Sequence, residues 1–394
     1  MTLTSTPTLY AISDFRDGWP PAPTRTYADY LSEWQAHDSP VHLPSDLAAA
    51  RAATRVEGGY MERLPLACIK AGLVDYAEKW HYDRTNRRDQ YGLEQPLFGY
   101  RTFHIDANDA QPDHAPFHSD DLCAFIAAHG APHILCVWGL GVDERILDTC
   151  AESFKIYYSI DAPPLRMPPD ISRHFNLILV GEEWQRSEVR ARHPTMPCEI
   201  LTIGPEFADD QTFQPLGLTK EYDLIYVACA QPYKRHDVLF EAMARCRRPV
   251  NCLCVIGYGD LTEALHMQAQ QLGIAVDFID PPGVSFEQVN YHINRARIGI
   301  VAGVNDGCPA ILTEYMLAGL PVLINAELCC GQRFITPETG VAASADAFSQ
   351  AIETLLDTVT SYQPRDYAIA HWGWASSVRQ LECAMRAAGY QSAR

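Results

Sequence analysis

The sequence predicts an α/β fold made of two Rossmann-like domains, each built on a mostly parallel sheet. Short β-rich apolar runs alternate with helical stretches, as expected for βαβ units. The length of 394 residues suggests two or three domains of about 100–200 residues each. A polar segment with two prolines and no periodicity, residues 204–221, is interpreted as an interdomain linker. We therefore expect one domain over residues 1–205 and a second over residues 206–370.

The second half carries the clearest alternation of strands and helices. Its expected strands are residues 223–229, 251–257, 275–280, 298–303 and 321–325. Its expected helices are residues 235–246, 261–272, 285–296 and 309–318. The third of these helices starts at Ser285, with Gln288 three residues later, which is a capping-box pattern. Five strands with intervening helices predict one Rossmann-like domain.

The first half is less regular. Strands are expected at residues 133–139, 155–160 and 177–181, whereas residues 1–120 are rich in Pro, Asp and aromatics and predict long loops. Residues 367–390 form a helical pattern that is broken near Gly373.

Charge and hydropathy restrict the class of partner. The formal net charge of −18 disfavours nucleic acid and anionic lipid, both of which require clustered Lys and Arg. No apolar run reaches the ~18 residues that a membrane helix needs, and the first residues lack a secretory pattern. We therefore expect a cytoplasmic protein whose partners are small or neutral molecules.

The cysteines and histidines do not predict a metal site. The 13 cysteines are scattered through apolar runs, as expected for free buried thiols. Cys252 with Cys254, and Cys329 with Cys330, lack the second ligand pair of a zinc site. Prolines beside His114 and His118 keep them off one helix face, so the loop over residues 104–121 is interpreted as solvated.

Two expected strand ends in the second half carry candidate ligand-binding residues. Lys234 and Arg235 follow the strand at 223–229, where cations can neutralise a diphosphate. The alternative is a solvated basic pair, although helix N-termini favour acids over bases. The strand at 251–257 ends at Gly257-Tyr-Gly259, and these two glycines would let a backbone approach a ligand. A plain turn needs the same two glycines.

A third strand end combines acids with a helix start. Asp306 follows the strand at 298–303, Gly307 permits a tight turn, and Glu314 falls inside the next helix. Free amides near Ala310 and Ile311 would form an anion cradle. The alternative is a capped helix with an incidental glutamate.

These residues resemble a known motif. Asp306-x7-Glu314, followed by YMLAGLPVL, is similar to the E-x7-E segment of glycosyltransferase family 4, a retaining GT-B family. The resemblance extends through Lys234, Gly257-Tyr-Gly259, Gly340-Val and Trp374-Ala, and it covers roughly residues 175–390.

The resemblance implies a role for each matching residue. Glu314 would bind the ribose hydroxyls, Lys234 the diphosphate and Asp306 the donor sugar. The backbone over Ala310, Ile311 and Leu312 would face phosphate, and the loop at 280–284, which contains Gly283, would face the base. The GT-B fold implies two domains that face each other across a cleft, with a C-terminal helix at about 371–394 crossing back to the first domain.

The chain departs from the family pattern at three positions. Asp306 replaces a glutamate, and Cys229 stands where the family has an arginine. Ile160-Asp161 aligns with a His-Asp pair, so only Asp161 remains as a candidate catalytic group near the sugar. On the acceptor side the candidates are Gly58, Gly59 and Trp138, each of which is equally well explained by a turn or a core role.

The resulting hypothesis is a transferase, a hexosyltransferase-type retaining glycosyltransferase that works without a metal. It would move a sugar from a nucleotide-sugar, with a UDP-sugar favoured, to a soluble small-molecule or saccharide acceptor. Leaving-group charge would be stabilised by Lys234, Arg235 and the helix after Pro309. Two alternatives stay open: a nucleotide-sugar epimerase, which needs further acid/base groups, and a non-catalytic nucleotide-sugar-binding homologue.

Overall fold

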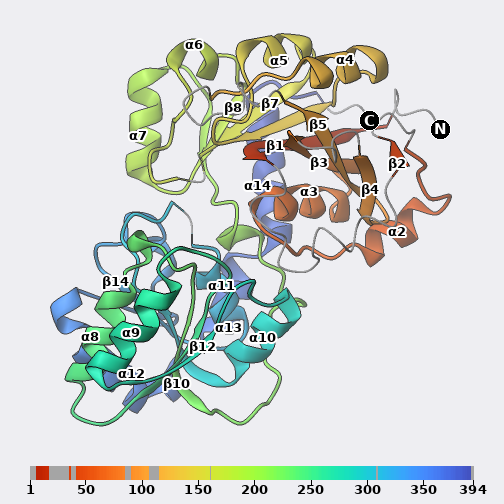
Figure 1. Ribbon diagram of the computed structural model, residues 1–394. Coiled ribbons are helices and arrows are strands. Elements are labelled where there is room, and N and C mark those ends of the chain that lie inside the picture. The colour runs from red at the N-terminus through yellow and green to blue at the C-terminus, as the bar shows by residue number, and fades with distance from the viewer. Residues whose placement is uncertain are drawn as a thin grey trace. The chain divides into compact units, whose positions relative to one another are not determined.

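The computed structural model describes residues 6–16, 35–36, 41–84, 90–105, 115–159, 161–307 and 309–391. The contacts between residues divide this chain into two compact units (Figure 1). Unit 1 comprises the described residues up to Thr202 and those from Trp374 onward, and unit 2 comprises Ile203–Gly373. Among the described residues, none of the helices has the length and apolar character needed to cross a membrane.

Unit 1 is built on a sheet in the order β2-β4-β5-β3-β1-β6-β7-β8-β9. The strands are β1 (Thr8–Arg16), β2 (Gln35–Ala36), β3 (Tyr76–Asp83), β4 (Gln90–Gln95), β5 (Phe98–His104), β6 (Ile134–Trp138), β7 (Phe154–Tyr158), β8 (Leu177–Val180) and β9 (Cys198–Ile200). β4 pairs antiparallel with both β2 and β5, and the other pairs are parallel. Chain order reverses between β1 and β6, which makes their junction the switch point of this sheet.

Helices cover both faces of the unit 1 sheet. They are α2 (Leu47–Ala53), α3 (Tyr60–Lys70), α4 (Asp120–His129), α5 (Glu144–Thr149), α6 (Pro169–Ser172), α7 (Glu183–Arg192) and α14 (Trp374–Ala387). α4 and α5 pack on one face, with α3 on the other (Figure 1). The C-terminal α14 contacts α3, and Lys70 Nζ lies 5.2 Å from the ring centroid of Trp374. The expected return of the last helix to the first domain is confirmed.

Unit 2 contains a fully parallel sheet in the order β12-β11-β10-β13-β14-β15. Its strands are β10 (Tyr222–Val227), β11 (Asn251–Val255), β12 (Ala275–Ile279), β13 (Ala296–Val301), β14 (Val322–Asn325) and β15 (Gly340–Ala343). The five predicted strands are confirmed, and the sixth, β15, was missed. Its four residues, GVAA, include one β-branched side chain, so they carry little strand signal of their own. Pairing with β14 is what makes this segment a strand.

The unit 2 helices are α8 (His236–Arg245), α9 (Thr262–Leu272), α10 (Phe286–Asn294), α11 (Ile311–Leu317), α12 (Phe348–Thr358) and α13 (Pro364–His371). α8, α9 and α12 bury their apolar residues against one face of the sheet. α10, α11 and α13 cover the other face. Apolar residues on both faces explain why the strands have near-continuous hydrophobic sequences.

The segment expected as a polar linker is packed inside unit 2. It begins with a 3-10 turn, η3 (Pro205–Phe207), and the side chains of Phe207 and Phe213 are buried. Thr313 Oγ1 of α11 donates to Pro205 O at 2.8 Å. Polar composition misled the prediction because several of the polar side chains, such as that of Asp209, are themselves buried.

Candidate functional site

The strand order of unit 2 reverses between β10 and β13. Ligands of open parallel sheets bind beyond the carboxyl ends of the strands at such a switch point. Lys234 follows β10 and Asp306 follows β13, so both loops leave the sheet at this junction. Topology therefore places these two predicted residues at the kind of sheet edge where open parallel sheets bind ligands.

Lys234 and Asp306 form an ion pair although 72 residues separate them in sequence. Asp306 is 6% exposed. The backbone carbonyl of Lys234 accepts a hydrogen bond from Tyr226 Oη at 2.5 Å. The side-chain Nζ of Lys234 lies 5.0 Å from the Tyr233 ring centroid. Cys329 Sγ lies 3.4 Å from the Asp306 carbonyl oxygen. The ammonium is thus fixed in place, and a bound phosphate would compete with Asp306 for it.

Arg235 is directed to a different partner. Its Nε and Nη2 contact the carboxylate of Asp237 at 2.9 and 2.8 Å. Its backbone has φ 50° and ψ 47°, the left-handed region, and among the described residues no other non-glycine has positive φ. Such a conformation costs about 1 kcal/mol for a residue with a Cβ. A contact between Arg235 and a donor stays a prediction.

Three glycines bring the loops after β10, β11 and β12 together. A Cβ on Gly259, whose φ is +125°, would lie 2.4 Å from Ala230 O. A Cβ on Gly283, whose φ is +81°, would lie 2.8 Å from Gly257 Cα. These two glycines serve backbone packing, whereas a Cβ on Gly257 would meet open space. Gly257 is therefore the glycine beside which a ligand has room.

We expect Gly259→Ala to destabilise the protein by about 2 kcal/mol, because the added Cβ meets a carbonyl oxygen at a positive φ. Urea unfolding measures the change. Gly217→Ala is the matched control, since Gly217 also has positive φ but its Cβ would meet nothing within 4 Å. Equal losses in the two variants would contradict the packing argument.

Glu314 lies in the first turn of α11 and is 5% exposed. The neighbouring side chains fix this helix: Thr313 bonds to Pro205, and Tyr315 Oη accepts from Val227 N at 2.8 Å. The helix begins two residues later than predicted. Leu312 N donates to Pro309 O at 3.1 Å, so this amide, one of the three expected to face phosphate, already has a partner within the turn. Gly307 lies in the bend before the helix.

His236, the first residue of α8, carries no motif that predicts a role from the sequence. The ring is 2% exposed and lies 4.7 Å from that of Tyr226. Within the described residues neither ring nitrogen has a hydrogen-bond partner. Burial, and then the Lys234 charge, lower the pKa of His236 to about 4. The ring is therefore neutral at pH 7 and adds no cation beside Lys234.

His236 should make stability depend on pH. The folded-state pKa of about 4 lies below the ordinary 6.5, so the unfolded chain binds the proton first as pH falls. Stability is then present above pH 6.5 and is lost towards pH 4, amounting to about 2 kcal/mol at pH 5 relative to pH 8. Chemical unfolding at both values tests this. In His236→Phe the loss between the two pH values should shrink by that amount; an unchanged pH profile would contradict it.

Unit 1 places a charged cluster at its own switch point. Arg166 Nη1 lies 2.7 Å from Asp161 Oδ2 and 3.8 Å from Asp14 Oδ2. A Cβ on Gly139 would lie 2.4 Å from Asp14 Oδ1. Asp161 was predicted here, whereas Asp14 and Arg166 were missed because no motif surrounds them. Ile160, which replaces the family histidine, lies outside the described residues.

The remaining acceptor-side candidates have structural explanations. Gly59 caps α3, where its N–H donates to Glu62 Oε2 at 2.8 Å, and Gly58 O accepts from Arg63 Nε at 2.8 Å. Trp138 is 1% exposed and lies at the end of β6. An acceptor role for these three residues stays a prediction.

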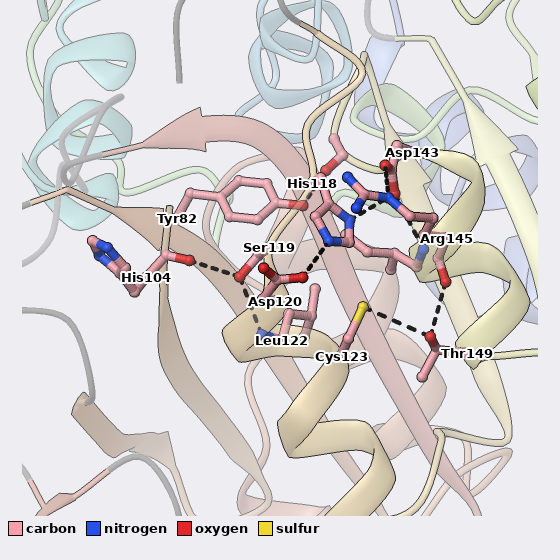
Figure 2. Close-up of polar contacts among 12 residues, drawn as sticks. Tyr82, His104, His118, Ser119, Asp120, Leu122, Cys123, Asp143, Arg145 and Thr149 are labelled. Atoms are coloured by element: carbon pink, nitrogen blue, oxygen red, sulfur yellow. Dashed lines mark hydrogen bonds and ion pairs between the residues drawn. The ribbon is translucent and has the colours of Figure 1, made fainter. Parts of the chain in front are cut away.

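The histidine-rich loop is tied to α4 and α5. Figure 2 shows His118 between two carboxylates, with Nε2 2.8 Å from Asp120 Oδ1 and Nδ1 3.1 Å from Asp143 Oδ1. The hydrogen bond with His118 is the largest of the causes that lower the pKa of Asp120. His114 lies outside the described residues. In the part of the chain that the structure describes, no three His, Cys, Asp or Glu residues are arranged to hold a metal ion, and the cysteines are free.

Part of the chain matches a known protein family. Residues 208–368 match the family described as glycosyl transferases group 1, which covers most of unit 2. The GDP-mannose-dependent alpha-(1-6)-phosphatidylinositol monomannoside mannosyltransferase of Mycolicibacterium smegmatis is 24% identical over 167 residues. That match covers 38% of this chain and 44% of the mannosyltransferase, so it spans less than half of either protein.

Solved structures resemble the whole chain. Sucrose-phosphate synthase from Thermosynechococcus elongatus has a TM-score of 0.65 at 14% identity, covering 97% of this chain and 98% of that one. Anabaena HepE in complex with UDP has a TM-score of 0.62 at 12% identity, covering 97% and 100%. Likeness at this identity establishes the fold, and the predicted GT-B class with two Rossmann-like domains is confirmed.

Proposed function

Residues 208–368 of this chain belong to the group 1 glycosyltransferases, and from this premise we propose that the chain transfers a sugar from a nucleotide-sugar to a hydroxyl group of a small-molecule or saccharide acceptor. The observation that carries the proposal is the Lys234–Asp306 pair at the switch point of unit 2, with Glu314 in the helix that follows Asp306.

Each of these groups has a task in such a transfer. Negative charge develops on the leaving diphosphate as the bond to the anomeric carbon breaks, and the Lys234 ammonium would stabilise it. The phosphate would then take the place of Asp306 at Nζ, which frees the Asp306 carboxylate to accept hydrogen bonds from sugar hydroxyls. Glu314 would accept hydrogen bonds from the two ribose hydroxyls.

A UDP-sugar is the favoured donor. The structures of HepE and of the pneumococcal O-GlcNAc transferase GtfA are complexes with UDP, which supports uracil in the base position. The mycobacterial relative is named as GDP-mannose-dependent, so guanine is the base to test against uracil. We further propose that transfer proceeds with retention at the anomeric carbon and without a metal ion, with Lys234 providing the positive charge.

Two other functions fit the same fold. An epimerase would need additional acid/base groups beside the donor sugar. A non-catalytic homologue would bind donor without turnover. Cys229, in the position of the family arginine, supports this second alternative because its Sγ lies 3.5 Å from Tyr233 Oη and brings no positive charge.

One experiment separates the three. The protein is incubated with UDP-, GDP- and TDP-sugars in EDTA, and thermal stabilisation, free nucleotide and sugar products are measured. Transfer predicts stabilisation by one nucleotide class and nucleotide release that acceptors accelerate. Stabilisation without release indicates a non-catalytic homologue, and a new sugar epimer on an intact nucleotide indicates an epimerase. If none of the UDP-, GDP- and TDP-sugars stabilised the protein, the proposed donor site would be excluded.

A further inference from the structure

Lys234 and Arg235, the cations in the loop after β10, are each opposed by a carboxylate. Lys234 pairs with Asp306, and Arg235 pairs with Asp237. A diphosphate has more acceptor oxygens than one ammonium group can satisfy. Neutral hydrogen-bond donors beside Lys234 would bind the remaining oxygens without breaking a second ion pair.

The Tyr233 hydroxyl lies where such a donor is needed. Tyr233 precedes Lys234 in the loop after β10, and its ring centroid lies 5.0 Å from Lys234 Nζ. Tyr233 is 36% exposed, so a ligand in solvent reaches its side chain. The hydroxyl extends one bond beyond the ring, and a diphosphate that accepts from Nζ is long enough to accept from this hydroxyl as well.

The hydroxyl of Tyr233 has a weak partner within the chain. Its Oη lies 3.5 Å from Sγ of Cys229, two residues after the end of β10. A thiol is a weak donor and its sulfur is a weak acceptor. A hydrogen bond to an ionised oxygen is about twice as strong as one between neutral groups. Exchange of the sulfur for a phosphate oxygen is therefore favourable.

Tyr258 approaches the same thiol from the loop after β11. Its carbonyl accepts from Ala230 N at 2.7 Å, which ties this loop to the one that carries Tyr233. Burial first, and then the neighbouring Cys229 thiol, raise the pKa of both tyrosines. Both hydroxyls therefore keep their protons at neutral pH and can donate them. Gly257, next to Tyr258, leaves open space on this side of the loop.

From these contacts we propose that Tyr233 and Tyr258 are donor-binding residues, whose hydroxyls leave Cys229 and donate to oxygens of the diphosphate that Lys234 binds. The inference rests on the proposed sugar transfer and adds two neutral donors to the charged groups of that site. Negative charge grows on the leaving diphosphate during transfer, so these hydrogen bonds strengthen in the transition state and raise kcat as well as affinity.

Inorganic pyrophosphate, UDP and uridine test the proposal, because uridine lacks the phosphates. Their dissociation constants for the full chain are measured by phosphorus and proton NMR titration. Tyr233→Phe and Tyr258→Phe each remove one oxygen atom and should weaken pyrophosphate and UDP about ten-fold, with uridine within about two-fold of the parent. Unchanged affinity for UDP and pyrophosphate in both variants, or an equal loss for uridine, would overturn the proposal.

Tyr222→Phe is the matched control. Tyr222 is the first residue of β10, at the opposite edge of the sheet, where its hydroxyl donates to Asp277 Oδ2 at 2.7 Å. Loss of this hydroxyl should leave all three affinities unchanged. A loss as large as that of Tyr233→Phe would show that the effect does not depend on a contact with phosphate.

Cys229→Ala separates a ligand contact from packing. It removes the partner that the two hydroxyls leave on binding, so UDP should bind within about two-fold of the parent or more tightly. A loss equal to that of Tyr233→Phe would assign both tyrosines to the support of Cys229 and overturn the proposal.

Nucleotide release from UDP-sugars distinguishes this proposal from the proposed transfer. Release that persists while the phenylalanine variants bind UDP as the parent does would keep the transfer and reject the tyrosine contacts. Weaker pyrophosphate binding in these variants, with no release by the parent, would support the tyrosine contacts and reject the transfer. A parent that binds neither pyrophosphate nor UDP would overturn the tyrosine contacts.

Discussion

Replacing Lys234 with alanine should lower kcat/KM for sugar transfer about 1000-fold. Preorganised groups that stabilise developing charge contribute 10²–10³-fold each. Here a second effect adds to the first. Asp306 is 6% exposed and pairs with Lys234, so the variant leaves a buried carboxylate that repels the leaving diphosphate. Nucleotide release at saturating and limiting donor gives kcat and kcat/KM separately.

Arg235→Ala is the matched comparison, since it removes the adjacent cation. The Arg235 guanidinium is held by Asp237 and its side chain is 36% exposed, so we expect a loss of less than ten-fold. A loss as large as that of Lys234→Ala would show that Arg235 leaves Asp237 to bind donor. Lys234→Ala with Asp306→Asn removes the repulsion as well and should recover part of the rate. No recovery would assign the whole effect to the lost ammonium.

Replacing Glu314 with alanine should weaken nucleotide binding about 100-fold. Hydrogen bonds to a charged group contribute about 1.5–3 kcal/mol each, and two ribose hydroxyls are available to this carboxylate. Calorimetric titration with UDP measures the change. Affinity within two-fold of the parent would remove Glu314 from the ribose site.

The comparison variants for Glu314 separate binding from folding. Glu314→Gln keeps the size of the side chain and one acceptor oxygen, so we expect an intermediate loss of affinity. Glu263→Ala removes an acid from the first turn of another unit 2 helix, α9, and should leave UDP affinity unchanged. The melting temperature of each variant identifies any loss that reflects unfolding.

A considerable part of the fold could be predicted because its signals are local. Apolar runs of five or six residues separated by helical periodicity predicted β10 to β14, and the capping box at Ser285 and Gln288 predicted the start of α10. The two wrong predictions, the missed strand β15 and the linker, concern segments whose structure depends on contacts that are not local. β15 is a strand because it pairs with β14, and the segment after Gly204 is buried because α11 covers it.

The candidate site divides in a similar way. The sequence alone identified Lys234, Asp306 and Glu314 as residues at strand ends and a helix start, through turn chemistry and spacing within about ten residues. The tertiary structure decided that Lys234 pairs with Asp306 while Arg235 turns to Asp237. It also decided that His236 is buried and that Asp14 joins Arg166. Secondary structure depends on neighbours a few residues away, whereas ion pairs and burial depend on which strands lie side by side in the sheet, and that arrangement is set by packing across the whole domain.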